Sequence, residues 1–266
     1  MEKIVNKIEN SESELNSRLI KKLQKLGEED KYQEYLNLLN KNLEKVKIEE
    51  CDEELLYLPK HFSKDIFIKP FNSEKDIEVE NEEEYKDKLF LRKTIVEWLN
   101  YAQHNLPKDY HLLVMDPLRT EDMVWKLYKK YFDKTKKENP DLSDKEIDLW
   151  IRNLLAMPDD IVPPGHMTGG AVDVVLADDH GKPMPMEVDY KIIPKEKQKF
   201  TFCLGLPEKI VERRKILYDT LTKIGFHNYF REYWHYSFGD AYWAVRRKNK
   251  IAIYGIPPKE LFEKIK

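Results

Sequence analysis

Apolar residues recur at the three- and four-residue spacing of a helix in two stretches near the N-terminus. Four leucines between residues 15 and 26 form the first stripe, and Ser11 begins a capping-box pattern in front of it. Gly27 ends this stripe, and a second one runs over residues 35–46 between charged positions. We predict a helical N-terminal extension over residues 1–60. It would either pack on the rest of the protein or offer a surface to a partner, and we favour packing.

Residues 61–84 mix short apolar pieces with polar turns, and we predict a connector there. Downstream the patterns become stronger, and we predict one domain over residues 85–266. Its strands do not follow a β-α-β order, which favours the α+β class, with flanking helices around a small sheet. The expected elements are a helix over 83–106, a strand over 110–115, helices beginning at Thr120 and Ser143, a strand over 171–176, a helix over 207–224, and strands over 229–238 and 251–254.

Composition removes several classes of protein. The 266 residues include 46 basic and 49 acidic side chains, which gives a net charge of −3, and the two signs are interleaved. No basic block marks a nucleic-acid surface, and no apolar run approaches the roughly 20 residues of a membrane span. The charged N-terminus lacks the apolar core of a signal peptide, so we expect a cytoplasmic protein.

The two cysteines, Cys51 and Cys203, cannot build a disulfide framework or a cysteine zinc site. A bound metal would need histidines and carboxylates.

The segment from Pro163 to Asp173 is the first that suggests chemistry. It places His166 seven residues before Asp173, with glycines at 169 and 170 between them. Glycine allows a tight return of the backbone, so a loop histidine can face a carboxylate on the next strand. Asp173 stands between two valines, where an ionised side chain is costly unless it is paired or binds a metal. Taken alone, the segment favours an aspartate paired to an arginine or to backbone N–H groups, with His166 as an ordinary loop residue.

A second segment places Glu232 three residues before His235 within a run of aromatic residues. Strand alternation would send the two side chains to opposite faces, so convergence on one site requires a bulge or a turn. Without one, the segment would be an aromatic core strand with a glutamate at its edge. Together the two segments offer two imidazoles, one ligating carboxylate and a spare carboxylate. Three protein ligands leave zinc an open position for water, which an adjacent glutamate can deprotonate.

The two motifs resemble those of the zinc D-alanyl-D-alanine dipeptidases of the VanX type, within the wider hedgehog-like metallopeptidases. The family pattern Ser-x-His-x-x-Gly-x-Ala-x-Asp is matched from Pro164 to Asp173, and Glu-Trp-Trp-His is matched from Glu232 to His235. The resemblance covers roughly residues 85–256. It implies one zinc ion per chain, bound by His166, Asp173 and His235, with Glu232 as the general base.

Two further residues follow from the same resemblance. The family has an arginine in an Asp-Ala-Tyr-Arg-Pro segment, and Arg119 lies in the matching Asp-Pro-Leu-Arg-Thr. The resemblance implies that Arg119 polarises the scissile carbonyl; otherwise it is a surface arginine at a helix start, a poor place for a cation. The family also holds the substrate ammonium with a carboxylate after a Pro-Met turn, which makes Asp189 the candidate, although a plain turn aspartate fits as well. The remaining histidines lack matching partners, and we expect structural or surface roles for His61, His104, His111, His180 and His227.

Pro164 stands in place of the family serine, and Tyr233 in place of a tryptophan. These departures leave the zinc chemistry intact and bear on the choice of peptide. The resemblance implies hydrolysis of D-Ala-D-Ala or a related short cell-wall peptide. From the composition we expect no nucleic-acid or membrane partner. Two alternatives stay open: a D,D- or L,D-carboxypeptidase acting on longer muropeptides, and a non-catalytic zinc module whose helical N-terminus binds a partner.

Overall fold

A computed structural model describes residues 38–69, 89–152, 154–258 and 261 of the chain. Its main sheet has five strands in the order β3-β5-β6-β8-β7, of which β3 and β5 are parallel and the other neighbours antiparallel. All seven residues of the central strand β6 are buried, as its run of alanines and valines predicts. The strands are β3 (Phe67–Ile68), β5 (His111–Asp116), β6 (Ala171–Ala177), β8 (His235–Ser237) and β7 (His227–Asn228).

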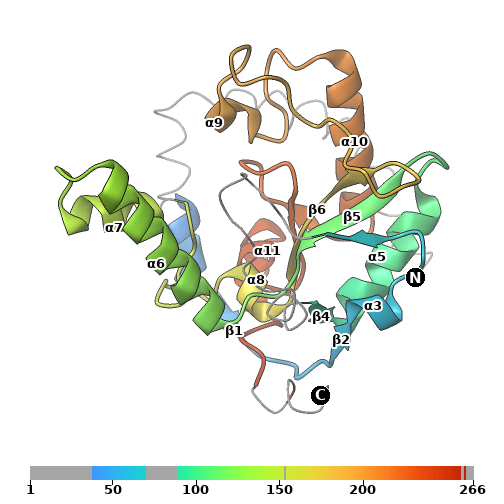
Figure 1. Cartoon of the computed structure of the whole chain (residues 1–266). Coiled ribbons are helices and arrows are strands. Elements are labelled where there is room, and N and C mark those ends of the chain that lie inside the picture. The colour runs from blue at the N-terminus through green and yellow to red at the C-terminus, as the bar shows by residue number, and fades with distance from the viewer. Residues whose placement is uncertain (1–37, 70–88, 153, 259–260, 262–266) are drawn as a thin grey trace.

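Two helices, α5 (Lys93–Asn105) and α10 (Glu208–Lys223), lie together on one side of this sheet (Figure 1). Their apolar stripes join the strand residues in the main core, where Leu99 of α5 and Leu217 of α10 are fully buried. A second pair, α6 (Glu121–Glu138) and α7 (Asp144–Arg152), extends away from the sheet and has a small core of its own. Met167 packs into that second core and so connects the pair to the short helix that carries His166.

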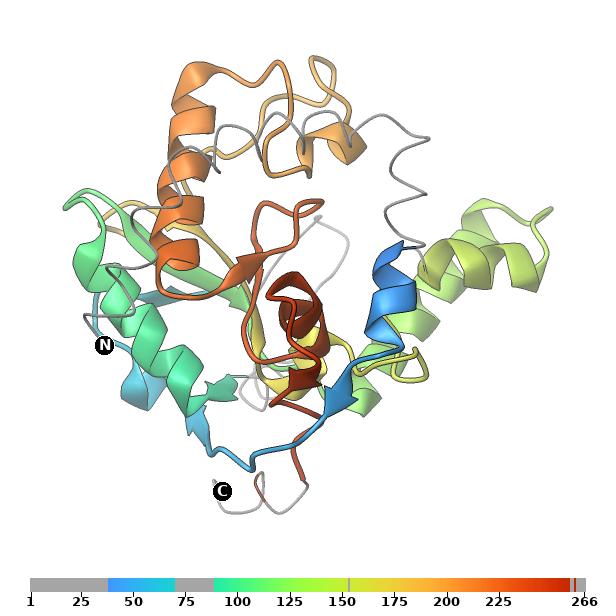
Figure 2. The same cartoon turned by 180° about the vertical axis from the view of Figure 1, so that it is seen from behind.

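Shorter elements complete the fold. Figure 2 shows strand β1 beside the C-terminal part of the chain, where it pairs with β9 in parallel. Leu43, Val46 and Ile48 pack there against Ala244 and Ala252, so the described part of the expected extension does lie on the body. These elements are β1 (Lys47–Ile48), β2 (Leu55–Tyr57), α3 (Leu58–His61), β4 (Phe90–Arg92), α8 (Gly165–Thr168), α9 (Lys195–Gln198), α11 (Ala241–Arg246) and β9 (Ile251–Ala252).

Local signals predicted several boundaries correctly. The Thr120 hydroxyl accepts from the N–H of Met123 at the start of α6, and Ser143 exchanges hydrogen bonds with Glu146 at the start of α7. Strands β5 and β6 cover the expected residues within one position. Helix α10 ends before Gly225, whose φ of 108° suits glycine.

The helix expected over 83–106 is wrong at its start. Within the described residues, Phe90–Arg92 is strand β4, and the helix begins only at Lys93. The apolar run at 89–91 fits either element, and backbone pairing with β2 selects the strand. The other part of that expectation, residues 83–88, lies outside the described residues, as do the leucines of the first N-terminal stripe.

The expected connector also differs from the structure. Phe67 and Ile68 form β3 and pair with β5, so this part of residues 61–84 belongs to the main sheet. Strand β2, in the expected extension, pairs with β4 in a separate antiparallel sheet of two strands. The start of a functional peptidase unit at residue 85 stays a prediction. Near the C-terminus, the loop expected between the last strands contains helix α11, for which Asp240 supplies the N-cap.

Candidate metal centre

Three neighbouring strands bring acidic and imidazole side chains into one row. Asp173 of β6 pairs with His235 of β8 on one side and, after a register shift between Val114 and Asp116, with Asp116 of β5 on the other. Cross-strand partners present their side chains on the same face of a sheet, 4.5–5.5 Å apart at Cβ as a rule. The sheet register alone therefore places Asp173 against His235, although 62 residues separate them in the chain.

His166 reaches the same place from the short helix α8. Gly169 ends that helix with a φ of 71°, and Gly170 follows so tightly against the chain that an added Cβ would lie 2.5 Å from the Phe238 carbonyl oxygen. The two glycines thus let the backbone turn directly from the histidine into β6. The His166 Nδ1 donates to the Pro117 carbonyl at 2.9 Å, which leaves Nε2 free of a proton in the neutral ring.

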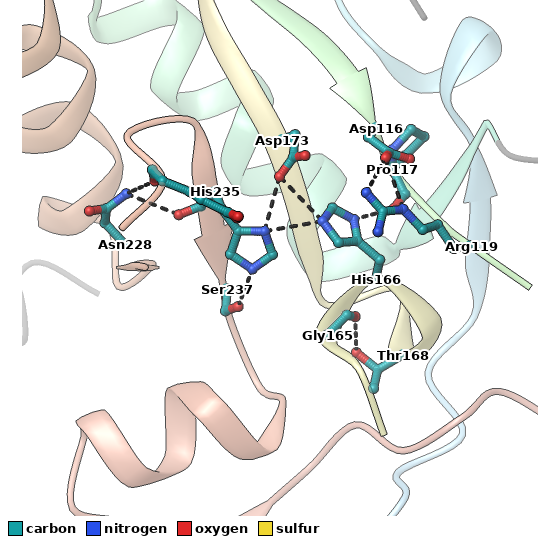
Figure 3. A network of polar contacts seen from close by, with 11 residues as sticks. Asp116, Pro117, Arg119, Gly165, His166, Thr168, Asp173, Asn228, His235 and Ser237 are labelled. Carbon is teal, nitrogen blue, oxygen red and sulfur yellow. Dashed lines mark hydrogen bonds and ion pairs between the residues drawn. The ribbon is translucent and has the colours of Figure 1, made fainter. Parts of the chain in front are cut away.

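Three donor atoms converge as a result (Figure 3). Oδ1 of Asp173 lies 3.0 Å from Nδ1 of His235 and 3.2 Å from Nε2 of His166, and the two nitrogens are 3.1 Å apart. Ligand atoms about 2.1 Å from a tetrahedral zinc ion lie about 3.4 Å from one another, so these atoms need move only a few tenths of an ångström. Their side chains are 6–14% exposed, which leaves a way in from solvent. The donor set of two imidazoles and one carboxylate fits zinc.

The electrostatics of the cluster also fit a cation. Burial opposes ionisation of Asp173, but the charges and hydrogen bonds of His166 and His235 hold its pKa far below the usual value. Burial likewise lowers the pKa of His235, while its hydrogen bond to Asp173 outweighs this and raises the pKa. Without metal, the cluster therefore favours a proton on the imidazole beside an ionised carboxylate. A divalent ion would take the place of that proton.

Glu232 lies in a turn and not in the expected strand. Residues 229–234 connect β7 to β8, and the backbone N–H groups of Glu232 and His235 donate to the carbonyls of Tyr229 and Glu232. Asn228 braces the turn by donating to the carbonyls of Glu232 and His235, both at 3.0 Å. The turn removes the strand alternation that would have separated Glu232 from His235. Burial raises the pKa of Glu232, which also feels the charges of His235, Asp173 and Arg119.

Arg119 lies at the same site. Its side chain is 23% exposed, and its Nε donates to Oδ2 of Asp116 at 2.9 Å. Its backbone N–H donates to the His166 carbonyl at 3.0 Å. Burial would lower the pKa of Arg119, but Asp116, Asp173 and Glu232 together raise it, so the guanidinium stays charged. The Asp116 carboxylate binds the guanidinium of Arg119, and the positive charge also interacts with the carboxylates of Asp173 and Glu232.

Asp189 is not brought to this cluster by its described contacts. Its side chain is exposed, and Oδ1 accepts from the Lys191 backbone N–H at 2.8 Å, as in a simple turn. Pro164 is the N-cap of α8 and makes no side-chain cap. Among the other histidines, His111 binds the Asp65 carbonyl and Asp179, and His227 accepts from Arg246.

Sequence reasoning missed the residues that hold the ligands in place. Asp116, beside Arg119, and the Pro117 carbonyl, which orients His166, could have been suspected only from proximity to a candidate residue. Ser237 lies two residues after His235, so strand periodicity put it on the same face. Asp240 follows as a buried aspartate at a helix start, which capping chemistry alone would explain.

Comparison with known proteins connects this geometry to a family. The family model described as D-Ala-D-Ala dipeptidase, peptidase family M15, matches residues 83–252. The chain belongs to this peptidase family. The matched range contains the three candidate ligands as well as Glu232, Arg119 and Asp189. This is the family that the two motifs resemble.

Two individual proteins resemble it. A D-alanyl-D-alanine dipeptidase from Synechocystis sp. is 30% identical over 127 residues, which cover 40% of this chain and 49% of that protein. The chain thus spans about half the length of this curated relative. A solved structure whose title describes the LdcB LD-carboxypeptidase and peptidoglycan recognition matches with 19% identity and a TM-score of 0.37, covering 82% of this chain and 80% of that one. Among the described residues, no helix is both long and apolar enough to cross a bilayer.

Proposed function

We propose that the chain is a zinc-dependent dipeptidase that hydrolyses D-Ala-D-Ala or a closely related short cell-wall peptide. The observation that carries the proposal is the triangle formed by His166 Nε2, Asp173 Oδ1 and His235 Nδ1, with sides of 3.0–3.2 Å. Three protein donors on one side leave room for water and substrate on the other. Membership of the dipeptidase family and the Synechocystis relative support the choice of peptide.

A zinc ion bound by these three residues would polarise a peptide carbonyl and lower the pKa of water to about 7. Glu232 would take the proton from the attacking water and give it to the leaving amine. A glutamate can serve in both steps, because its carboxylate accepts the proton and its carboxyl then releases it. The charges of His235, Asp173 and Arg119 act on this carboxyl, which supports its place beside the cluster, and backbone hydrogen bonds hold the turn after β7.

Arg119 would stabilise the negative charge that develops on the carbonyl oxygen. Its guanidinium is already fixed by Asp116, so little reorganisation accompanies the reaction. Asp189 would bind the free ammonium of the substrate. Its described hydrogen bond is local, and this role rests on the family motif alone. A small zwitterion suits such paired local charges in a chain whose net charge is only −3.

A substrate panel tests the proposal. Zinc-loaded protein is given D-Ala-D-Ala, N-acetyl-D-Ala-D-Ala and a pentapeptide stem, and release of D-alanine is followed. We expect cleavage of the free dipeptide and rejection of the blocked one, because the ammonium is needed for binding. Preferred cleavage of the pentapeptide would replace the dipeptidase assignment by a carboxypeptidase. Glu232→Gln provides the mechanistic control: it should lose about 10²- to 10⁴-fold in kcat while zinc content stays at one per chain.

A further inference from the structure

A buried carboxylate lies behind the metal cluster and has no role in the mechanism above. Asp240 is 1% exposed. Its Oδ1 accepts from the Trp243 N–H at 2.7 Å and caps α11, whereas Oδ2 is buried without a hydrogen-bond partner among the described residues. A cap needs only one oxygen, and an asparagine would serve as well. An unpaired buried carboxylate oxygen is costly, so its retention calls for a second function.

The chain makes room for this carboxylate beside a candidate ligand. Gly165 directly precedes His166, and a Cβ added there would lie 2.5 Å from Oδ2 of Asp240 and 3.5 Å from Oγ of Ser237. Oδ2 of Asp240 and Oγ of Ser237 therefore both lie next to the α-carbon of Gly165. A side chain at 165 would clash with this carboxylate and with the Cβ of Ala171, which would lie 2.8 Å from the added Cβ.

Ser237 connects that point to the cluster. It is fully buried, and its Oγ lies 3.3 Å from Nε2 of His235 (Figure 3). Nδ1 of the same ring faces Asp173, so Nε2 is the nitrogen that points away from the metal position. A serine hydroxyl can accept from a ring N–H and donate to a carboxylate at the same time.

We infer that Ser237 and Asp240 are positioning residues that orient His235 as a metal ligand: Nε2–H donates to the Ser237 hydroxyl, and that hydroxyl donates to the Asp240 carboxylate. This chain of hydrogen bonds keeps the proton on Nε2 and therefore leaves the Nδ1 lone pair free for the metal. The inference rests on the proposed metal role of His235. Ser237 would act on His235 as the Pro117 carbonyl acts on His166, by binding the ring nitrogen that faces away from the metal position. Partners of this kind typically contribute 10- to 100-fold in metal affinity.

Zinc affinity tests the inference separately from catalysis. The dissociation constant is measured by competition with a chromophoric chelator, and the cobalt-substituted protein gives an absorption spectrum of the ligand field. We expect Ser237→Ala and Asp240→Asn each to weaken zinc binding about 10- to 100-fold and to alter the cobalt spectrum. Because the two residues act in series, the double variant should lose little more than either single one.

The matched control is Asp160→Asn. Asp160 also accepts a backbone N–H through one oxygen, from Met157 at 2.7 Å, but takes no part in the cluster, so its variant should bind zinc normally. Thermal unfolding of the metal-free proteins separates lost positioning from lost folding, and if Asp240→Asn does not fold, Ser237→Ala decides. Wild-type affinity and spectrum in the folded variants would overturn the inference. A wild-type protein that binds zinc but leaves D-Ala-D-Ala intact would overturn only the proposed function.

Discussion

Nε2 of His166 and Nδ1 of His235 lie 3.1 Å apart, although 69 residues separate them in the chain. A neighbouring group holds each ring in this orientation. The Pro117 carbonyl binds Nδ1 of His166, and the Ser237 hydroxyl lies next to Nε2 of His235. Two imidazoles that face each other beside a carboxylate cannot satisfy all three lone pairs with one shared proton. A divalent cation satisfies all three, and this geometry motivates the predictions that follow.

Removal of any ligand should remove the metal. We expect His166→Ala and Asp173→Ala to contain less than one zinc per chain by elemental analysis, and to lose peptidase activity with it. His104→Ala changes an exposed histidine and serves as the control with normal zinc content. Chelation of the wild type should abolish activity, and added zinc should restore it. Chelation should also lower the unfolding temperature, because zinc at 1,000 times its dissociation constant stabilises a fold by about 4 kcal/mol. Full activity after complete metal removal would contradict the assigned centre.

Loss of the Arg119 guanidinium should slow catalysis and leave the metal in place. Arg119→Met removes one stabilising group from the developing oxyanion, which typically costs about 10²- to 10³-fold in kcat. Steady-state kinetics and zinc content on the same preparation check this. Arg152→Met is the comparison, since Arg152 forms a similar ion pair with Asp148 and Asp159 away from the cluster. An unchanged kcat in Arg119→Met would exclude the proposed role.

The buried Arg92 should contribute strongly to stability. It is 0% exposed, and it donates to the carbonyls of Thr168 and Gly255 and to the Glu50 carboxylate. Arg92→Met removes these hydrogen bonds and the buried ion pair, although Glu50 still accepts from the Gly255 N–H. We expect a loss of about 3 kcal/mol in the free energy of unfolding. Denaturant titration measures it. The neighbouring Lys93→Met breaks only an exposed pair with Glu54 and should have little effect. Equal losses in both variants would show that burial of Arg92 is not the cause.

His227 should make stability depend on pH. Burial lowers its pKa well below 6.5, and the positive charges of Arg246 and Arg247 lower it further. The unfolded chain then binds a proton that the folded chain excludes, so the free energy of unfolding should fall as pH drops below about 6.5, by up to about 1.4 kcal/mol per pH unit. The difference between wild type and His227→Phe, measured by denaturant titration from pH 7.5 to 5, isolates this contribution. A difference that does not vary with pH would contradict it.

Local sequence signals predicted the elements that depend on local chemistry. The capping residues Thr120 and Ser143 begin helices as expected, and Gly225 ends α10. Strand β6 forms where the valine-rich run predicts it. These features follow from backbone conformation and side-chain capping within a few residues. Short apolar runs were ambiguous, and Phe90–Arg92 became a strand because residues 55–57 pair with it.

The residue types that form the candidate centre were evident from the sequence. Both motifs were identified there, together with the requirement that a turn bring Glu232 and His235 to one site. The sequence did not show that His235 lies against Asp173 and His166, which are 62 and 69 residues away in the chain. That proximity depends on the register of β6 against β8 and on the path of the chain through Gly169 and Gly170.

By itself, the sequence determined which side chains could bind a metal and which chemistry they could support. Only the tertiary structure decided which atoms face one another: Nε2 of His166 and Nδ1 of His235 toward the cluster, with the Pro117 carbonyl and Ser237 behind them. The physical reason is that the hydrogen bond made by one ring nitrogen of a histidine determines whether the other nitrogen is free to bind a metal. Those partners come from strand pairing and from the packing of Asp240 against Gly165, which no local pattern encodes.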